Sequence, residues 1–556
     1  YEKIKYECLV IRVTGKDFKS YSETVTKRYQ NLEKQVAKTK SEDVFGVFMN
    51  SLAELADPHT NYFVPNRAQE FNEEMARTYD GIGARLQLEN EMVKISEIIP
   101  GGPAFKAKTL NVNDKIIAVA QGKDGEFVDV IGWRLDNTVS KIKGLKGTFV
   151  RLKVIQAGQE LSAKPVIIEL MRDKIVLEDQ SAKKTIKTVK SGAKTYKIGI
   201  IEIPAFYADF NAYRAGDPNY KSTTRDVKLL LDTLKTQQVD GVIIDLRSNG
   251  GGSLMEAIEL TGLFIKTGPV VQVRDRDGVE VNEDDNPGIA YSGPLGVMVD
   301  RFSASASEIF AGAIQDYGRG IIMGTQTYGK GTVQQPIDVS RLISPTDRLM
   351  LLTKQQEEDA KNSTVSRQSA PQYGQINMTM AKFYRVNGSS TQHKGVMPDI
   401  QFPMIFPADK YGESSEPSAL PWDVIKPSKY VPLANLSDQS VEEFQLHLLV
   451  EESLDRSSWL DIEQNGQDAA AQVGIDHQHA FGVELRQRGG GIEDHRGGAA
   501  AGLGQRERRL GGARGGAMRI DGFPERERRP VHAADHCTIS EGSLNRSTMA
   551  LAPTSA

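Results

Sequence analysis

The chain has 556 residues, 39% of them hydrophobic and 26% charged, and a formal net charge of −4. This composition indicates a globular protein of about three or four domains and excludes a fibrous or disordered chain. The small net charge gives no reason to expect a nucleic-acid partner, and no apolar run approaches the roughly 18 residues that span a membrane. Cys8 and Cys537 are the only cysteines, which excludes a disulfide framework and a cysteine-rich zinc site.

Residues 1–77 are predicted to form an N-terminal helical region. Apolar residues recur at helical spacing among charges over residues 44–55, and Asp57-Pro58-His59-Thr60 then breaks the pattern. Residues 78–170 have a different sequence pattern: short apolar runs alternate with Gly and Asp turns, which is typical of a small β-rich domain. The strands predicted there cover residues 81–88, 93–99, 115–119, 150–155 and 166–170.

Residues 171–405 are predicted to form an α/β layered core. From about residue 195 onward, apolar strand patterns alternate with helical ones. Residues 241–246 and 295–299 have the pattern of buried strands, and residues 305–315 have that of a helix. The fold class predicted from these patterns is therefore multidomain α+β.

The last part of the chain is divided into a C-terminal extension, residues 406–465, and a doubtful tail, residues 466–556. Lys429 is the last lysine, six of the eight histidines follow Tyr430, and residues 485–530 are dense in Arg, Gly and Ala. A disordered basic tail is one interpretation. We favour a shift of reading frame beyond roughly residues 440–465, because the composition changes abruptly, and we assign the tail no function.

A glycine-rich segment, residues 245–252, follows the first of the buried strands. Glycines let backbone N–H groups point into a cavity, and the start of a helix adds a partial positive charge, so the segment could hold a phosphate or an oxyanion. No Gly-Lys-Ser/Thr follows, which disfavours a P-loop. A tight turn with a glycine cap is the structural alternative.

A serine-rich segment, residues 302–308, follows the second buried strand and opens a helix. A strand-to-helix corner can present a serine oxygen beside free N–H donors, which is the geometry that acyl transfer needs. The alternative is an ordinary serine N-cap with Glu308 in the first turn. From spacing alone, Ser303, Ser305 and Ser307 are all candidate nucleophiles.

A lysine between two glycines, Lys330, completes the set. If it is buried, its pKa falls and it can take a proton from a serine. A surface loop lysine is the alternative. His59 and His393 are the only histidines before Tyr430, and each has a turn-like context, so a Ser-His-Asp triad lacks an evident partner.

Together, these segments closely resemble the tail-specific proteases of bacteria, also called C-terminal processing peptidases (serine peptidase family S41). The likeness runs from residue 1 to about residue 430. Its motifs cover residues 57–60, 245–252, 303–308, 329–334, 383–388, 395–399 and 420–423. The resemblance implies a PDZ domain at residues 78–170 and a Ser-Lys protease core at residues 171–405.

The resemblance also implies roles for particular residues. Ser305 would be the nucleophile, Lys330 the general base, and Gln334 the group that orients the lysine. Asp316 stands where a third relay member is sometimes placed. Because a carboxylate next to Lys330 would raise its pKa, we expect Asp316 to be structural or to tune protonation.

The remaining part of the implied machinery is an oxyanion hole made of the backbone N–H groups of Gly251 and Ala306. Neutral Lys330 would deprotonate Ser305, which would attack the scissile carbonyl. Water would then hydrolyse the acyl-enzyme with the same lysine as base. The resemblance implies no metal and no cofactor.

The small domain resembles a PDZ domain of the bacterial protease type through residues 80–86, 98–104 and 112–117. Its glycine-containing loop would capture a terminal carboxylate, and the next strand would pair with the peptide by β-augmentation. The residues predicted to bind substrate are Gly81, Ile82, Gly83, Ala84, Arg85 and Leu86. A small β-barrel that only packs on the core is the alternative.

The leading hypothesis is an endopeptidase whose protein substrates are recognised partly by an apolar, free C-terminus. An inactive PDZ adaptor is the alternative, and the intact Ser305, Lys330 and Gln334 argue against it. An acyl-CoA-type enzyme is a third reading. The family resemblance implies a location in the bacterial periplasm. Association with a membrane and the identity of an adaptor protein are left open. Because the chain starts at Tyr1, we expect it to be a fragment or a processed form.

Overall fold

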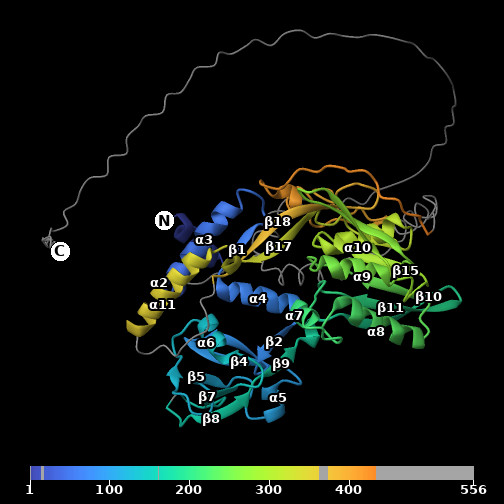
Figure 1. The fold of residues 1–556 in the computed structure, drawn as a ribbon. Coiled ribbons are helices and arrows are strands. Elements are labelled where there is room, and N and C mark those ends of the chain that lie inside the picture. Colours follow the sequence, from blue (N-terminus) through green and yellow to red (C-terminus); the bar gives the residue numbers. More distant parts are fainter. Residues whose placement is uncertain (1, 14–17, 161, 362–372, 434–556) are drawn as a thin grey trace, which may run out of the picture. The chain divides into compact units, whose positions relative to one another are not determined.

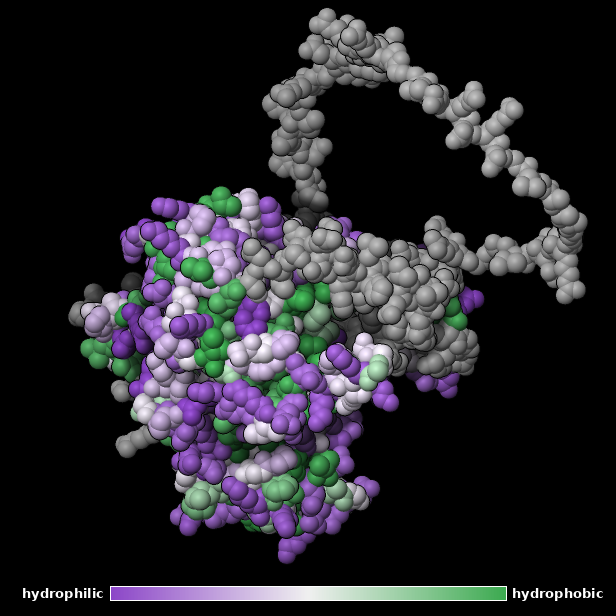
Figure 2. Space-filling model, turned by 90° about the vertical axis from the view of Figure 1, so that its right-hand side faces the viewer, coloured by the Kyte–Doolittle hydropathy of each residue, from purple (hydrophilic) through white to green (hydrophobic). Residues whose placement is uncertain are grey.

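The computed structural model describes residues 2–13, 18–160, 162–361 and 373–433 (Figure 1). The doubtful tail, residues 466–556, and residues 434–465 of the extension lie outside the described residues. On the face drawn in Figure 2, hydrophobic residues form small patches between hydrophilic ones. None of the helices in the described ranges is long and apolar enough to cross a membrane.

The N-terminal region is helical, as predicted, with one short strand. The DPHT turn, residues 57–60, leads directly into this strand, β1, which pairs antiparallel with a strand more than three hundred residues later in the chain (Asn61 opposite Asn377). The turn is therefore fixed against the protease core. The elements are α1 (Glu2–Val13), α2 (Phe18–Ala37), α3 (Ser41–Ala53), β1 (Asn61–Phe63) and α4 (Pro65–Ala76).

The small domain is a five-stranded sheet in the order β3-β4-β5-β7-β8, with β6 added to β5. Alternate residues of its strands are buried, as the period of a half-buried strand requires, and Val150, Leu152 and Val154 are fully buried. A separate ribbon, β2 with β9, extends the unit to Val176. The elements are β2 (Thr78–Gly81), β3 (Ala84–Glu89), β4 (Met92–Ile98), α5 (Pro103–Ala107), β5 (Lys115–Gln121), β6 (Val128–Asp129), α6 (Leu135–Ile142), β7 (Phe149–Ile155), β8 (Val166–Met171) and β9 (Asp173–Val176).

The core is built on a six-stranded sheet in the order β10-β11-β12-β15-β16-β19. All neighbours are parallel except β10 and β11. Parallel strands are buried on both faces, which explains the continuous apolar runs of β12 and β15. The elements are β10 (Lys183–Ser191), β11 (Lys194–Glu202), α7 (Phe210–Arg214), α8 (Thr223–Thr236), β12 (Gly241–Asp245), α9 (Leu254–Gly262), β15 (Leu295–Val299), α10 (Ala306–Asp316), β16 (Ile321–Gly324) and β19 (Ile400–Gln401).

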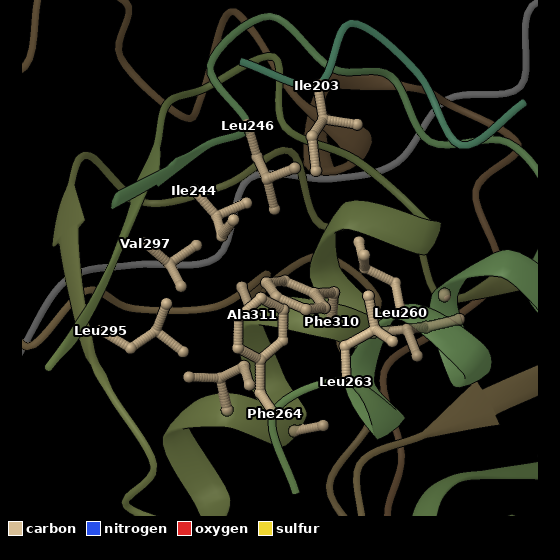
Figure 3. Packing of buried hydrophobic residues seen from close by; sticks show 14 of the residues in the cluster. Ile203, Ile244, Leu246, Leu260, Leu263, Phe264, Leu295, Val297, Phe310 and Ala311 are labelled. Carbon is tan, nitrogen blue, oxygen red and sulfur yellow. The ribbon is translucent and has the colours of Figure 1, made fainter. Parts of the chain in front are cut away.

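Apolar packing fixes α9 and α10 against this sheet. Figure 3 shows Phe310 of α10 among Leu260 of α9 and strand residues such as Ile244 and Val297, and all four are fully buried. The N-terminus of α10, where the serine-rich segment lies, is therefore held rigidly at the end of β15.

A second sheet carries the lysine segment. Its strand β18 pairs with β17 along one edge and with β1 and β13 along the other. Because β17 begins just after Lys330, this sheet brings the DPHT turn and the lysine segment to the same strand. The elements are β13 (Gly268–Arg274), β14 (Val279–Asp284), β17 (Thr332–Asp338), α11 (Pro345–Lys361) and β18 (Gln375–Tyr384), with short 3-10 helices η1 (Glu178–Gln180), η2 (Val339–Arg341) and η3 (Glu413–Ser415).

Candidate active site

Ser305 occupies a strained strand-to-helix corner. It is the residue before α10, with φ 56° and ψ −113°, a conformation that costs a non-glycine residue about 1–3 kcal/mol. Its side chain is partly exposed, and its Oγ has no hydrogen-bond partner among the described residues. Strain at a reactive hydroxyl is the geometry of a nucleophile elbow.

The hydroxyls of the other two candidate nucleophiles, Ser303 and Ser307, are occupied by hydrogen bonds. The Ser303 hydroxyl donates to the carbonyl of Leu246 (2.8 Å), and the Ser307 hydroxyl donates to the carbonyl of Asn249 (2.9 Å). Both serines are fully buried. They tie α10 to the glycine-rich loop, so Ser305 is the one serine of the three that can meet a substrate.

The glycine-rich loop approaches Ser305 closely. A Cβ added to Gly251 (φ +105°) would lie 2.8 Å from the Cβ of Ser305, so only glycine fits there. The N–H of Gly251 donates to the side-chain oxygen of Asn249 (2.9 Å) in this conformation. Within the described part of the chain, the N–H groups of Ala306 and Gly252 have no acceptor. Of the two predicted oxyanion donors, Ala306 is therefore free and Gly251 is engaged.

The turn that carries Lys330 is held on both sides. Gly329 (φ +93°) lies so close to His393 that an added Cβ would be 2.8 Å from the His393 carbonyl carbon, and the N–H of His393 donates to the carbonyl of Gly329 (2.7 Å). The N–H of Gly331 donates to the side-chain oxygen of Gln392 (2.7 Å). Both flanking glycines are thus needed for close contact, which places Lys330 in a fixed position.

Glu308 joins the two catalytic segments, a role that the sequence reasoning missed. One of its carboxylate oxygens, Oε2, accepts from the N–H groups of both Ser305 (2.7 Å) and Lys330 (2.9 Å). The other, Oε1, accepts from the Thr327 hydroxyl (2.6 Å) and the Gly329 N–H (2.7 Å). The Ser-x-x-Glu spacing was a signal for a capping residue, but not for a bond to the lysine segment.

Burial dominates the electrostatics of this carboxylate. Glu308 is fully buried, and burial raises its pKa to about 7, although the four donors act in the opposite direction. Because one oxygen atom accepts from both backbones, Ser305 and Lys330, the candidate nucleophile and base, are both anchored to a common atom.

Lys330 has the electrostatic environment of a general base. Burial lowers its pKa, and the nearby carboxylates of Glu413, Glu308 and Asp57 oppose that shift. Its side chain remains partly exposed. No hydrogen bond joins its Nζ to the Ser305 Oγ in the described structure, so the reacting pair would close by side-chain rotation when substrate arrives.

The side chain of Gln334 makes no hydrogen bond to Lys330 among the described residues. Its side-chain amide donates to the hydroxyls of Thr332 (2.9 Å) and Thr379 (3.0 Å). It bridges β17 and β18 at the point where the register shifts. The orientation of Lys330 by Gln334 therefore stays a prediction, because the side-chain hydrogen bonds of Gln334 in the described structure go to the two threonines.

Asp316 lies far from the reacting pair. It is the last residue of α10, eleven residues after Ser305, which corresponds to about 16 Å along a helix. Its carboxylate binds the Arg385 guanidinium (2.7 and 3.0 Å) and the Asn387 amide (2.8 Å). Of the two roles that we expected for Asp316, structural or protonation-tuning, this geometry fits the structural one. It does not fit a direct proton relay with Ser305.

Replacing Asp316 with alanine should therefore destabilise the fold without changing the acid-base chemistry. The buried Arg385 guanidinium would lose its counter-ion, and breaking a buried pair costs about 3–5 kcal/mol. We expect a clear fall in melting temperature but an unchanged pH dependence of kcat/KM below the melting range. A shift of the pH profile in Asp316→Ala would instead place Asp316 in proton transfer.

The candidate peptide groove lies on the small domain. The carbonyl of Ile82 accepts from the N–H of Ala104 (2.8 Å), and the carbonyl of Gly83 accepts from the N–H of Ile99 (2.9 Å). The N–H groups of Ile82 and Gly83 have no acceptor in the described ranges. Gly83 (φ +74°) packs directly on Gly102. The loop thus presents free donors, as a carboxylate-binding loop must.

The groove continues along β3, whose second edge is unpaired among the described strands. A cavity of about 270 Å³ lies there, between β3, α6 and the α4 helix. Its lining includes Ile82, Ala84, Arg85, Leu86, Val139 and Ile142. Of the predicted substrate-binding residues, Ile82, Ala84, Arg85 and Leu86 line this cavity, whereas Gly81, which ends β2, and Gly83 do not. Arg85 also forms an ion pair with Glu97.

A strained serine, a partly buried lysine beside it in the fold and an open groove are features that serine hydrolases acting on peptides share. Comparison with known proteins specifies the family. Models of four domains match the chain: the tail-specific protease N-terminal domain at residues 1–66, PDZ at 71–155, peptidase family S41 at 197–402, and the C-terminal domain of tail-specific protease at 406–449. Residues 197–402 thus match peptidase family S41, and together with the other three matches this agrees with the resemblance to tail-specific proteases.

Two curated relatives and one solved structure illustrate the similarity. The tail-specific protease of Haemophilus influenzae is 42% identical over 436 residues, which are 78% of this chain and 56% of that protein. The carboxy-terminal processing protease CtpB of Bacillus subtilis is 28% identical over 64% of this chain and 62% of its own length. The PDZ domain of a Vibrio cholerae carboxy-terminal protease, solved in complex with peptide, is 43% identical over 18% of this chain and 97% of that domain, with a TM-score of 0.17. The chain thus spans a little over half the length of the curated relatives.

Proposed function

We propose that this protein is an endopeptidase that cleaves protein substrates through a Ser305 acyl-enzyme, with Lys330 as general base. One observation carries the proposal: a single Glu308 oxygen accepts from the backbone N–H groups of both Ser305 and Lys330, while the hydroxyls of Ser303 and Ser307 are occupied by hydrogen bonds. The similarity to peptidase family S41 and to a tail-specific protease supports the same assignment.

The chemistry follows from the positions of these groups. Neutral Lys330 takes the Ser305 proton as Oγ attacks the scissile carbonyl, and the developing oxyanion meets the free N–H of Ala306 at the start of α10. A second donor is the Gly251 N–H after it leaves Asn249, or the free N–H of Gly252. Protonated Lys330 then gives its proton to the leaving amine, and water completes the cycle.

We further propose that the small domain selects substrates by a free, apolar C-terminus. The free N–H groups of Ile82 and Gly83 would hold the carboxylate, and hydrogen bonds to a charged group are worth roughly 1.5–3 kcal/mol. The terminal side chain would enter the cavity beside Leu86 and Ile142, where burial adds about 1.5–3 kcal/mol. The peptide would extend the sheet at the open edge of β3.

This recognition predicts that a substrate with a free apolar C-terminus is cleaved faster than the same substrate with an amidated C-terminus. The loss should be about tenfold or more in kcat/KM and should arise mainly from KM, because the groove binds but does not react. Matched substrates ending in Asp or Lys should also be slower. Equal kcat/KM for free and amidated termini would refute selection by the C-terminus, even with Ser305 active.

We place the protein in the bacterial periplasm, because its relatives include bacterial tail-specific proteases. Association with the periplasmic face of a membrane, and delivery of substrates by an adaptor, belong to the same proposal. Fractionation of the native host with an antibody against residues 78–170 tests the location, and recovery in the cytoplasmic fraction would contradict it.

A further inference from the structure

A second buried carboxylate, Glu413, lies beside the lysine segment. It belongs to η3, in the extension after the core, and its side chain is fully buried. Its N–H donates to the carbonyl of Tyr328 (3.1 Å), two residues before Lys330. The extension is therefore fastened directly to the turn that carries the general base.

The Glu413 carboxylate has two side-chain partners. Its Oε2 lies 2.8 Å from Nε2 of His59, and its Oε1 accepts from the side-chain amide of Gln392 (2.8 Å). An ionised carboxylate can only accept, so both partners donate. Because Gln392 in turn accepts from the N–H of Gly331 (2.7 Å), a continuous chain runs from the imidazole to the residue that follows Lys330.

The position of His59 is well defined. The buried carboxylate of Asp57 accepts from the N–H of His59 (2.9 Å), from the N–H of Thr60 (3.1 Å) and from the hydroxyl of Thr379 on β18 (2.8 Å). The imidazole is only 17% exposed. The DPHT turn thus holds His59 against Glu413. Because the imidazole is largely buried, this is not a contact between two freely exposed side chains.

Three carboxylates act electrostatically on Lys330: Glu308 from α10, Asp57 from the DPHT turn and Glu413 from η3. All three favour the protonated amine, which cannot act as a base. Glu308 and Asp57 each accept from several neutral donors, whereas the side-chain partners of Glu413 are Gln392 and His59.

The negative charge of Glu413 also affects Tyr328, which belongs to the same turn as Lys330. Burial raises the pKa of Tyr328 to about 12, and the carboxylates of Glu413, Glu416 and Glu308 add to that shift. The Glu413 charge therefore acts on the residues around the base, and His59 is a direct hydrogen-bond partner of that carboxylate.

We propose that His59 is a positioning residue for the general base: by binding the Glu413 carboxylate, it prevents that charge from holding Lys330 protonated. The inference rests on the proposed Ser305–Lys330 chemistry and adds to it a regulator of the protonation state of the base. It also gives the extension a direct role at the active site, through Glu413.

The test is the pH dependence of kcat/KM in His59→Phe, Glu413→Gln and the double variant. Without His59, the uncompensated carboxylate should move the acidic limb of the profile to higher pH by about one unit. Glu413→Gln should move the limb to lower pH, because a carboxylate that favours the protonated lysine is gone. The double variant should return toward the Glu413→Gln profile. His59→Gln, which keeps a donor near the Nε2 position, should shift the limb less than His59→Phe.

Asp409→Asn is the control, because it removes an exposed carboxylate of the same extension that is absent from the surroundings of both Lys330 and Tyr328. Its profile should match that of the unaltered protein. Activity lost in His59→Phe with an unmoved limb would mean a structural role and overturn the proposal. If His59→Phe does not fold, as judged by circular dichroism, an unmoved limb in Glu413→Gln overturns it instead. Absence of any cleavage by the unaltered protein would contradict the proposed function, which is a separate failure.

Discussion

Ser305→Ala, Lys330→Ala and the double variant should each lose proteolysis by a similar factor, on the order of 10⁴ or more. The two side chains act in one step, so removing the second after the first should cost little more. Lys330→Arg should fail as well, because the guanidinium stays protonated and cannot accept the serine proton. Steady-state kcat/KM on an unfolded protein substrate measures the four losses directly.

Lys394→Ala is the matched control for these variants. Lys394 is an exposed lysine of the neighbouring loop, and its ammonium lies over the Trp422 ring (3.3 Å) and not in the turn of Lys330. It should keep nearly full activity. Near-normal proteolysis by Lys330→Ala would exclude the lysine as the base, and activity that falls in two multiplicative steps would mean that the residues act independently.

Glu308→Gln should lower kcat by roughly 100-fold or more with little change in KM. Glutamine has the same shape, but its amide nitrogen cannot accept, so two of the four donors around Glu308 would face another donor. Each unsatisfied buried donor costs about 1–3 kcal/mol. The Ser305 and Lys330 main chains would then no longer share one acceptor, and pre-steady-state acylation should slow by the same factor as kcat.

Glu256→Gln offers a comparison variant for that effect. Glu256 is also fully buried, its pKa is also raised to about 7 by burial, and its carboxylate accepts from Ser222 and Thr224 away from Ser305. Its replacement should leave the acylation rate far less affected than replacement of Glu308. Equal kinetic losses in both variants would mean that Glu308 acts only through general stability.

Glu308 also predicts a pH dependence of stability. Burial raises its pKa from 4.5 to about 7 in the folded state, so between these values the folded chain holds a proton that the unfolded chain has released. Its contribution to the free energy of unfolding should therefore decrease as pH rises from about 4.5 to 7. Chemical unfolding over this range should show a shallower decrease in Glu308→Gln. An unchanged slope would contradict the raised pKa.

The sequence was sufficient to locate five strands of the small domain, two buried strands of the core and the serine corner. The prediction of a strand at residues 295–299 agrees with β15, and the predicted helix at residues 305–315 agrees with α10 within one residue. These segments were predictable because a buried parallel strand has a continuous apolar run and because the serine corner is punctuated by small residues. The choice of Ser305 over Ser303 and Ser307 came from the family resemblance, and only the structure shows that the other two hydroxyls are occupied.

Long-range pairing was beyond the reach of the sequence patterns. The pairing of β1 with β18 and the contact of His59 with Glu413 join residues more than three hundred positions apart, and neither segment alone indicates its partner. Glu308 has the spacing of a capping residue, so its second bond, to Lys330, could not be separated from that simpler role. Gln334 likewise needs the register of β17 against β18 to reveal its two threonine partners.

The central claim is that Ser305 forms the acyl-enzyme with the help of Lys330. Its most direct test is to quench the reaction with a slowly hydrolysed active ester and to locate the acyl group by peptide mass spectrometry. The acyl group should lie on Ser305 in the unaltered protein, and Lys330→Ala should acylate far more slowly at neutral pH. An acyl group on Ser303 or Ser307, or equally fast acylation of Ser305 in Lys330→Ala, would contradict the account.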